Sequence, residues 1–264
     1  MNSKLLLAAS LALLAACGSS GNAALSKTFN YSAATAPTTA EQSAGTSAQS
    51  SVSSTASFSS TPTAENGAAL AGVALDLAGA ALGDAAFGMA SPGAIKGALT
   101  RAAAAGFDTC ATVAANTVTF NNCVQTESGF SVSLNGSITA TAGHVSWSIS
   151  AGFSGTDNGA SVSINMHHTG DITVTATKIT GNAASDFSGS VSSQGQSASF
   201  GFAVAVLFDL TYQTAPTSCV TDGTVEVRRV WTAKPAGASG AAFSDVGVKL
   251  IWSGCGTFQV AHSS

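Results

Sequence analysis

The second half of the chain alternates between apolar and hydroxyl-bearing residues with a period of two. Phe130, Val132 and Leu134 are separated by serines, and the same alternation returns at residues 145–149. Since successive side chains of a β-strand point to opposite faces of the sheet, this pattern predicts strands with one buried face and one hydrated face. We therefore expect residues 108–264 to form an antiparallel β-domain.

Pairs that contain glycine interrupt the alternation at regular intervals, and such pairs are typical of tight turns between strands. They are Asn135-Gly136, Asn158-Gly159, Thr169-Gly170, Gly181-Asn182, Gln194-Gly195 and Asp222-Gly223. Short strands joined by tight turns favour a curved antiparallel meander, either an open sheet or a barrel-like one. The predicted fold class is α+β and mainly β, with one or two N-terminal helices packed on the sheet.

Residues 66–107 are predicted to form a helical segment that precedes the strands. Its first part, residues 68–89, is apolar nearly all round, which is typical of a buried helix or of a membrane helix. Asp76 and Asp84 lie within it, and each would be costly at the middle of a bilayer. We therefore favour a helix that packs on the sheet.

The strand predicted at residues 200–212 gives that helix a partner. It is apolar at nearly every position, so both of its faces must be covered, and we expect residues 68–89 to cover one of them. A second helix is predicted from Ser91, which can cap its N-terminus, to Gly106, which suits the left-handed position at its C-terminus.

The N-terminus has the organisation of a bacterial export signal. Lys4 supplies a positive charge, and residues 5–16 form an apolar run that is too short to span ~30 Å of hydrocarbon at about 1.5 Å per residue. The run ends in Leu14-Ala15-Ala16-Cys17, which resembles the lipobox of bacterial lipoproteins. The resemblance implies that residues 1–16 are a signal peptide. It also implies that Cys17 carries a diacylglycerol and an amide-linked acyl chain such as palmitate, which together form a stable membrane anchor.

The residue after the lipobox cysteine bears on location. In the lipoprotein sorting rule of some Gram-negative bacteria, Asp at this position retains the protein at the inner membrane, whereas this chain has Gly18. The resemblance therefore implies a lipid-anchored protein of the cell envelope, with a preference for the outer membrane.

Residues 17–65 differ in composition from the rest of the chain. They are rich in Ser, Thr, Ala and Gly, and Lys27, Glu41 and Glu65 are their only charged residues. They show no apolar periodicity, and such a segment buries too little apolar surface to offset its ordering entropy. We expect a disordered tether with an r.m.s. span of roughly 35–40 Å between the lipid and the domain.

Four cysteines remain after Cys17, and an even number in an exported chain predicts two disulfides. They are Cys110, Cys123, Cys219 and Cys255. Three pairings are compatible with the sequence. We favour Cys110–Cys123 and Cys219–Cys255, because each pair is nearest in sequence and lies at the edges of predicted strands. A four-cysteine zinc site is disfavoured, because no two cysteines have the C-x2-4-C spacing.

The sequence lacks the common catalytic and cofactor motifs. It contains no G-x-S-x-G, phosphate-binding loop, dinucleotide fingerprint or H-E-x-x-H. Charged residues make up 8% of the chain and the net charge is −4, which does not fit a nucleic-acid-binding surface. We therefore expect no enzymatic activity, no cofactor, no metal and no nucleic-acid partner.

Two sets of polar residues are candidates for a site nevertheless. His167 and His168 are adjacent on a predicted strand and point to opposite faces, so only one of them could join His144 and Asp171 in a metal site. Arg229 interrupts a row that is otherwise apolar, and a buried arginine must be paired or reach the rim. It could face an anionic ligand head group, or a local carboxylate could match it.

Together these features predict a lipid-anchored lipoprotein of the cell envelope with a non-enzymatic β-domain. The expected partners are the membrane, through the acyl chains on Cys17, and either an apolar small molecule or an envelope protein. Two alternatives stay open: a secreted hydrolase acting on envelope or extracellular polymers, and an integral outer-membrane β-barrel. No pair of carboxylates in the sequence stands out for the hydrolase.

Overall fold

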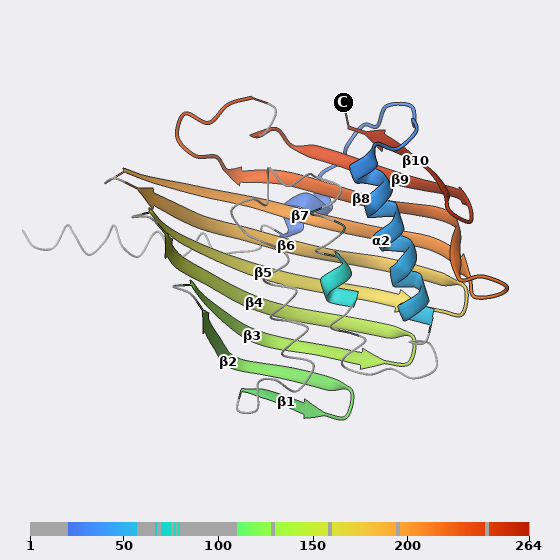
Figure 1. Ribbon diagram of the computed structural model, residues 1–264, viewed down its shortest axis with the longest axis horizontal. Helices are drawn as coiled ribbons and strands as arrows, with labels where there is room; N and C mark the ends of the chain where they lie inside the picture. Colours follow the sequence, from blue (N-terminus) through green and yellow to red (C-terminus); the bar gives the residue numbers. More distant parts are fainter. Residues whose placement is uncertain are drawn as a thin grey trace, which may run out of the picture.

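Ten strands form one antiparallel sheet, in which each strand pairs with its neighbours in the sequence (Figure 1). The computed structural model describes residues 21–56, 67, 70–74, 77, 79, 110–127, 130–157, 160–193, 196–240 and 243–263. The strands are β1 (Ala111–Ala114), β2 (Thr117–Glu127), β3 (Phe130–Thr141), β4 (His144–Asp157), β5 (Ala160–Val174), β6 (Lys178–Ser193), β7 (Gln196–Gln213), β8 (Cys219–Ala233), β9 (Val246–Gly254) and β10 (Thr257–His262). The predicted antiparallel meander is therefore confirmed. Its sheet is open, with β1 and β10 as the edge strands.

Short helices lie on both faces of this sheet. Helix α2 (Thr39–Ala56) crosses the strands on the face turned to the viewer in Figure 1. Residues 70–74 are also helical, as are residues 67, 77 and 79. Helix α1 (Gly21–Ser26) packs on the opposite face. Within the described residues, no helix combines the length and the apolar character needed to cross a membrane.

The face that carries α2, which we name the inner face, holds the hydrophobic core. Apolar side chains that alternate along the strands, such as Ile149, Ile172 and Leu250, are completely buried there. Leu70 and Leu77 belong to the same core as the inner side chains of β7. The described part of residues 68–89 therefore packs on the sheet, as the apolar pattern predicts. The predicted helix at residues 91–106 lies outside the described residues.

The opposite face of the sheet, which we name the outer face, is covered in part by α1. Ala203 and Ala205 of β7 are completely buried on this face, where they contact Ala24 of α1. Strand β7 is thus covered on both faces, and the second cover comes from a segment for which the sequence predicts no structure. The predicted disordered tether is corrected for residues 21–56, which contain two helices.

Helix α2 is polar, and its start is fixed by a capping box. The backbone N–H of Thr38 donates to Oε2 of Glu41 at 2.6 Å, and the N–H of Glu41 donates to the Thr38 hydroxyl at 3.4 Å. Ala44, Gly45 and Ala48 form the buried stripe of the helix. A Cβ added at Gly45 would overlap the ring of Phe258, so α2 lies directly on that ring.

Four of the six predicted glycine turns lie inside strands, and this part of the prediction is wrong. They are Asn135-Gly136, Thr169-Gly170, Gly181-Asn182 and Asp222-Gly223. Gly136, Gly181 and Gly223 have φ values of +122°, +133° and +104°, where an added Cβ would overlap the backbone of the neighbouring strand. Glycine in these places lets long strands bend instead of reversing. The strands are consequently longer than the turn spacing predicts. Asn158-Gly159 and Gln194-Gly195 fall between strands, outside the described residues.

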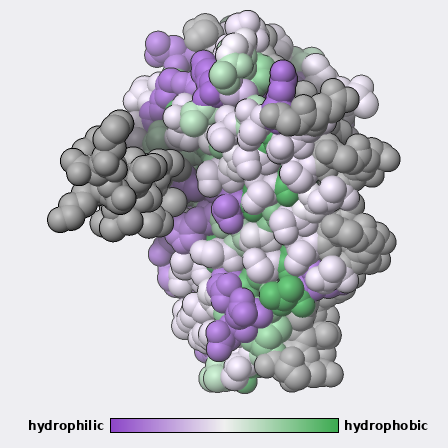
Figure 2. Space-filling view, turned by 90° about the vertical axis from the view of Figure 1, so that its left-hand side faces the viewer, coloured by the Kyte–Doolittle hydropathy of each residue, from purple (hydrophilic) through white to green (hydrophobic). Residues whose placement is uncertain are grey.

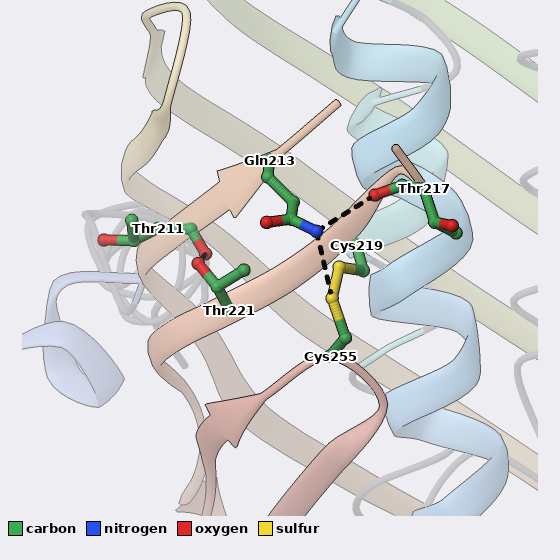
Figure 3. The surroundings of a disulfide bond; sticks show 6 residues. All are labelled: Thr211, Gln213, Thr217, Cys219, Thr221 and Cys255. Carbon is green, nitrogen blue, oxygen red and sulfur yellow. Dashed lines mark hydrogen bonds between the residues drawn. A yellow bond between two sulfur atoms is a disulfide. The ribbon is translucent and has the colours of Figure 1, made fainter. Parts of the chain in front are cut away.

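Two disulfides brace the sheet, and their pairing is the one that the sequence favours. Cys110 is joined to Cys123 with Cα atoms 5.2 Å apart, and Cys219 to Cys255 with Cα atoms 5.4 Å apart. Figure 3 shows the second bridge, where Nε2 of Gln213 lies 3.4 Å from Sγ of Cys255. This bridge joins the start of β8 to the turn between β9 and β10, and therefore ties three strands together.

Candidate functional site

Arg229 is buried on the inner face and held by its own chain. Its side chain is on β8 in the row of Val225 and Val227, as the alternation predicts, and the residue is only 5% exposed. Its Nη2 donates to the carbonyl oxygen of Ser244 at 3.1 Å, and the guanidinium carbon lies 5.7 Å from the centre of the Trp231 ring. Burial lowers the pKa of Arg229, and the carboxylate of Asp245 opposes that shift. These contacts correspond to the local pairing that the sequence allows as an alternative to a ligand.

The adjacent histidines point to opposite faces, as expected for neighbours on a strand. His168 is completely buried on the inner face, where its Nδ1 accepts from the Ser185 hydroxyl at 2.8 Å and its Nε2 donates to the carbonyl oxygen of Ala71 at 3.2 Å. Burial lowers its pKa to about 4, so the ring is neutral near pH 7. His167 is exposed on the outer face, with Nε2 3.3 Å from the hydroxyl of Ser148. His168 therefore connects β5 to the helical residues on the inner face.

The structure brings His144 and Asp171 together on the outer face, and no third ligand joins them among the described residues. Nε2 of His144 lies 3.0 Å from Oδ1 of Asp171, and both side chains are exposed. Among the residues that the structure describes, no group of three or more His, Cys, Asp or Glu residues is arranged to hold a metal ion. His168 faces the core and cannot join this pair.

Hydroxyl side chains form a continuous row across the outer face. The strand register places six of them side by side on β2 to β7, namely Thr126, Ser131, Ser154, Ser163, Ser190 and Ser199. Five of these, together with Gly155, Thr156, Ser161 and Val162, line an open hollow of about 430 Å³. The end of the sheet seen in Figure 2 is covered mainly by residues of intermediate hydropathy. The described residues of this lining carry many hydrogen-bonding groups and no carboxylate, imidazole, amine or thiol.

A second polar cluster on the outer face binds the N-terminal segment. We name residues 21–35 the N-terminal strap, because they run from α1 across the outer face to the edge strand β10. Arg228 on β8 donates through Nη1 to the carbonyl oxygens of Leu25 at 2.8 Å and Lys27 at 3.0 Å. Leu25 lies in the last turn of α1 and Lys27 directly after it, where backbone carbonyls lack partners within the helix. Arg228 thus caps α1 from the sheet.

Glu226 is the centre of this cluster. Its Oε1 accepts from the Tyr31 hydroxyl at 2.6 Å and from Nε of Arg228 at 2.5 Å, and Nζ of Lys249 lies 3.5 Å from its Oε2. Burial opposes the ionisation of Glu226, but the hydrogen bonds from Arg228 and Tyr31 outweigh burial and hold its pKa below the ordinary value. Burial raises the pKa of Tyr31, and the hydrogen bond to Glu226 adds to that shift. The ionised carboxylate therefore holds the middle of the strap.

Contacts near both ends of the strap add to its attachment. Lys27 forms an ion pair with Asp245, which also accepts from the backbone N–H of Trp231 at 2.9 Å. At the sheet edge, the N–H and carbonyl of Thr35 both bond to Val260 of β10. The strap therefore satisfies part of an edge strand that would otherwise present free backbone groups.

The sequence contains signals for the strap that composition alone does not reveal. Thr38 and Glu41 have the S/T-x-x-E spacing of a capping box, and Phe29 and Tyr31 stand two residues apart, as on a strand. The residues that bind the strap, Arg228 and Glu226, lie two positions apart on β8 and share its outer face.

The predicted lipidation site, Cys17, lies outside the described residues. Comparisons with protein-family models, with curated proteins and with solved structures find no match.

Proposed function

We propose that this protein is a lipid-anchored lipoprotein of the cell envelope, whose β-domain is non-enzymatic and supports an envelope complex. The attachment of the strap is the observation that carries the proposal. The chain that follows Cys17 enters α1 at Gly21, and α1 is fixed to the sheet by Arg228. A lipid on Cys17 would therefore be attached to the folded domain itself. Such an arrangement suits a protein whose task is to hold a surface at a membrane.

The distribution of polar groups supports a non-enzymatic role. Among the described residues that line the hydroxyl-lined hollow, none can transfer a proton near neutral pH. His168 is engaged with Ser185 and Ala71 in the core, and the Glu226 cluster is occupied by the strap. Acid–base and nucleophilic catalysis both need such groups to face a substrate.

The packing of the inner face favours support of a complex over transport of an apolar ligand. The concave apolar surface that could hold a ligand contacts the chain's own side chains, among them Leu70 and Leu77 and the buried stripe of α2. The hollow on the outer face and the hollow beside α2 each have a predominantly hydroxyl lining among the described residues. A carrier of acyl chains would instead need an apolar cavity.

The anchor is tested by producing the full chain and its Cys17→Ser variant in a Gram-negative host. We expect the native chain to remain with the membranes, and its N-terminal peptide to have the mass of a cysteine with diacylglycerol and an amide-linked acyl chain. The Cys17→Ser variant should be unmodified. An unlipidated, freely released native chain would refute the proposal.

Native mass spectrometry of the purified protein tests the carrier alternative, which predicts a retained apolar molecule.

A further inference from the structure

The place where the chain enters the fold constrains how a lipid-anchored domain can sit. Helix α1 lies on the outer face above β7, where Ala24 is completely buried against Ala203 and Ala205. Its first residue, Gly21, is therefore held over the interior of the sheet, away from both edge strands.

Only four peptide steps separate Gly21 from Cys17. A fully extended chain spans at most about 3.5 Å per residue, so the lipidated cysteine can lie no more than about 14 Å from the start of α1, whatever the conformation between them. This reach is less than half of the roughly 35–40 Å expected for a free tether of residues 17–65. A lipid on Cys17 would thus hold the domain close to the bilayer, by a point on its outer face.

We propose that the outer face around α1, flanked by Ser188 on β6 and Thr232 on β8, lies against the polar headgroups of the bilayer that holds the anchor. This inference rests on the proposed lipidation of Cys17. Because the link is short and starts above the sheet interior, the opposite orientation would place the whole thickness of the domain between Gly21 and the membrane.

The chemistry of the outer face suits a headgroup layer. Charged side chains of this face form ion pairs within it, as in Lys178–Asp209 and Arg228–Glu226. Between these pairs lie hydroxyl groups, which can donate to phosphate oxygens and accept from ammonium groups. These ion pairs weaken the field that the described part of the face presents to an anionic or a zwitterionic surface.

The orientation is tested with a fluorophore attached to one introduced cysteine in the lipidated full chain. The native cysteines do not compete, because Cys17 is blocked by lipid and the other four are paired. Ser188→Cys and Thr232→Cys place the probe on the outer face. Thr46→Cys places it on the exposed side of α2, across the sheet. The proteins are reconstituted in phosphatidylcholine vesicles that contain headgroup-spin-labelled phosphatidylcholine as quencher.

We expect quenching at positions 188 and 232 to exceed quenching at position 46 several-fold. Equal quenching at the three positions, or stronger quenching at position 46, would overturn the proposed orientation. If mass analysis of the same samples finds Cys17 unmodified, the proposed function fails as well. If Cys17 is lipidated and quenching is equal, only the orientation fails.

A matched pair of variants separates the role of α1 from general effects on folding. Ala24→Glu places a long charged side chain at the completely buried contact with β7 and should undock α1 while leaving the inner core untouched. Thr28→Glu places the same side chain at an exposed position of the strap. The difference in quenching between the outer-face positions and position 46 should disappear in Ala24→Glu and persist in Thr28→Glu. If the difference persisted in Ala24→Glu, docking of α1 would not set the orientation, and the inference would be wrong.

Discussion

Nη1 of Arg228 lies 2.8 Å from the carbonyl oxygen of Leu25, a residue 203 positions earlier in the chain. Helix α1 has only six residues, and a helix of that length is not stable in isolation. A guanidinium at its C-terminal carbonyls satisfies acceptors that would otherwise lack partners and is favoured by the helix dipole. The order of the strap therefore depends on a contact between β8 and the extreme N-terminal part of the described chain.

We expect Arg228→Ala to lower the free energy of unfolding by about 2 kcal/mol, because it removes several charge-assisted hydrogen bonds and leaves Glu226 with fewer partners. Urea denaturation measures this loss. Trypsin should also cleave faster after Lys27, whose carbonyl is released. Lys249→Ala is the control, since Lys249 is more exposed and lies 3.5 Å from Glu226. It should cost less than about 1 kcal/mol. Equal losses for the two variants would contradict the role assigned to Arg228.

Stability should fall when the pH is lowered from about 6.5 to about 4, because of His168. Burial lowers its pKa from the ordinary 6.5 to about 4 in the folded protein, so the unfolded chain binds more protons throughout this window. The contribution of the neutral imidazole to the free energy of unfolding is complete above pH 6.5 and is lost as the pH falls to 4. A pKa shift of this size corresponds to about 3 kcal/mol in the free energy of unfolding. Urea denaturation at a series of pH values measures it.

The control for this prediction uses an exposed histidine. His168→Gln should be less stable near pH 7 but should lose most of the slope between pH 6.5 and 4, because no buried imidazole remains to be protonated. His144→Gln should keep the slope of the native protein. An unchanged slope in His168→Gln would show that other groups cause it. Glu226 and Asp245 also have lowered pKa values, and their contributions are lost at lower pH as each carboxylate is protonated.

The sequence predicts the two faces of the sheet better than it predicts the ends of the strands. Alternation places Val132, Trp147 and Ile149 on one face because the period of a strand is local and fixed. A glycine pair does not reveal whether the chain reverses or bends, because both need a positive φ. Gly181 lies inside β6 instead of at a reversal, and only its long-range register with β5 and β7 decides that outcome.

The candidate surface could be predicted only in part, for a similar reason. Separation in the sequence favours the observed cysteine pairs among three possible pairings, and the opposite orientations of His167 and His168 follow from strand geometry. The strap does not follow from its composition, because its stability comes from hydrogen bonds to Arg228 and Glu226 about 200 residues away. The capping box at Thr38 and Glu41 is the one local signal for α2.

Gly181→Ala tests the proposal that glycines bend the long strands. Gly181 has a φ of +133°, and its Cβ would overlap the carbonyl oxygen of Asp171. We expect a loss of at least about 2 kcal/mol in the free energy of unfolding, from backbone strain and from disruption of the β5–β6 pairing. Gly254→Ala is the matched control, because nothing lies within 4 Å of its added Cβ. It should change stability by less than about 0.5 kcal/mol. Similar effects for both substitutions would rule out a special role for Gly181.

Gly45→Ala tests whether α2 packs directly on the ring of Phe258. In an exposed helix this substitution would stabilise the protein by about 1 kcal/mol through helix propensity. Here the added Cβ would overlap the ring, which is stacked on Trp252 with centroids 5.3 Å apart and cannot move freely. We therefore expect Gly45→Ala to be destabilising, in spite of the gain in propensity.

A double-mutant cycle with Phe258→Leu identifies the cause of that loss. The smaller side chain leaves room for the Cβ of residue 45, so Gly45→Ala should cost less in the Phe258→Leu background than in the native one. We expect a coupling of about 1 kcal/mol or more between the two substitutions, as is usual for residues in direct contact. Additive effects in urea denaturation would mean that α2 does not rest on Phe258. In that case the capping box and the pairing of Thr35 with β10 would have to hold the helix on the inner face.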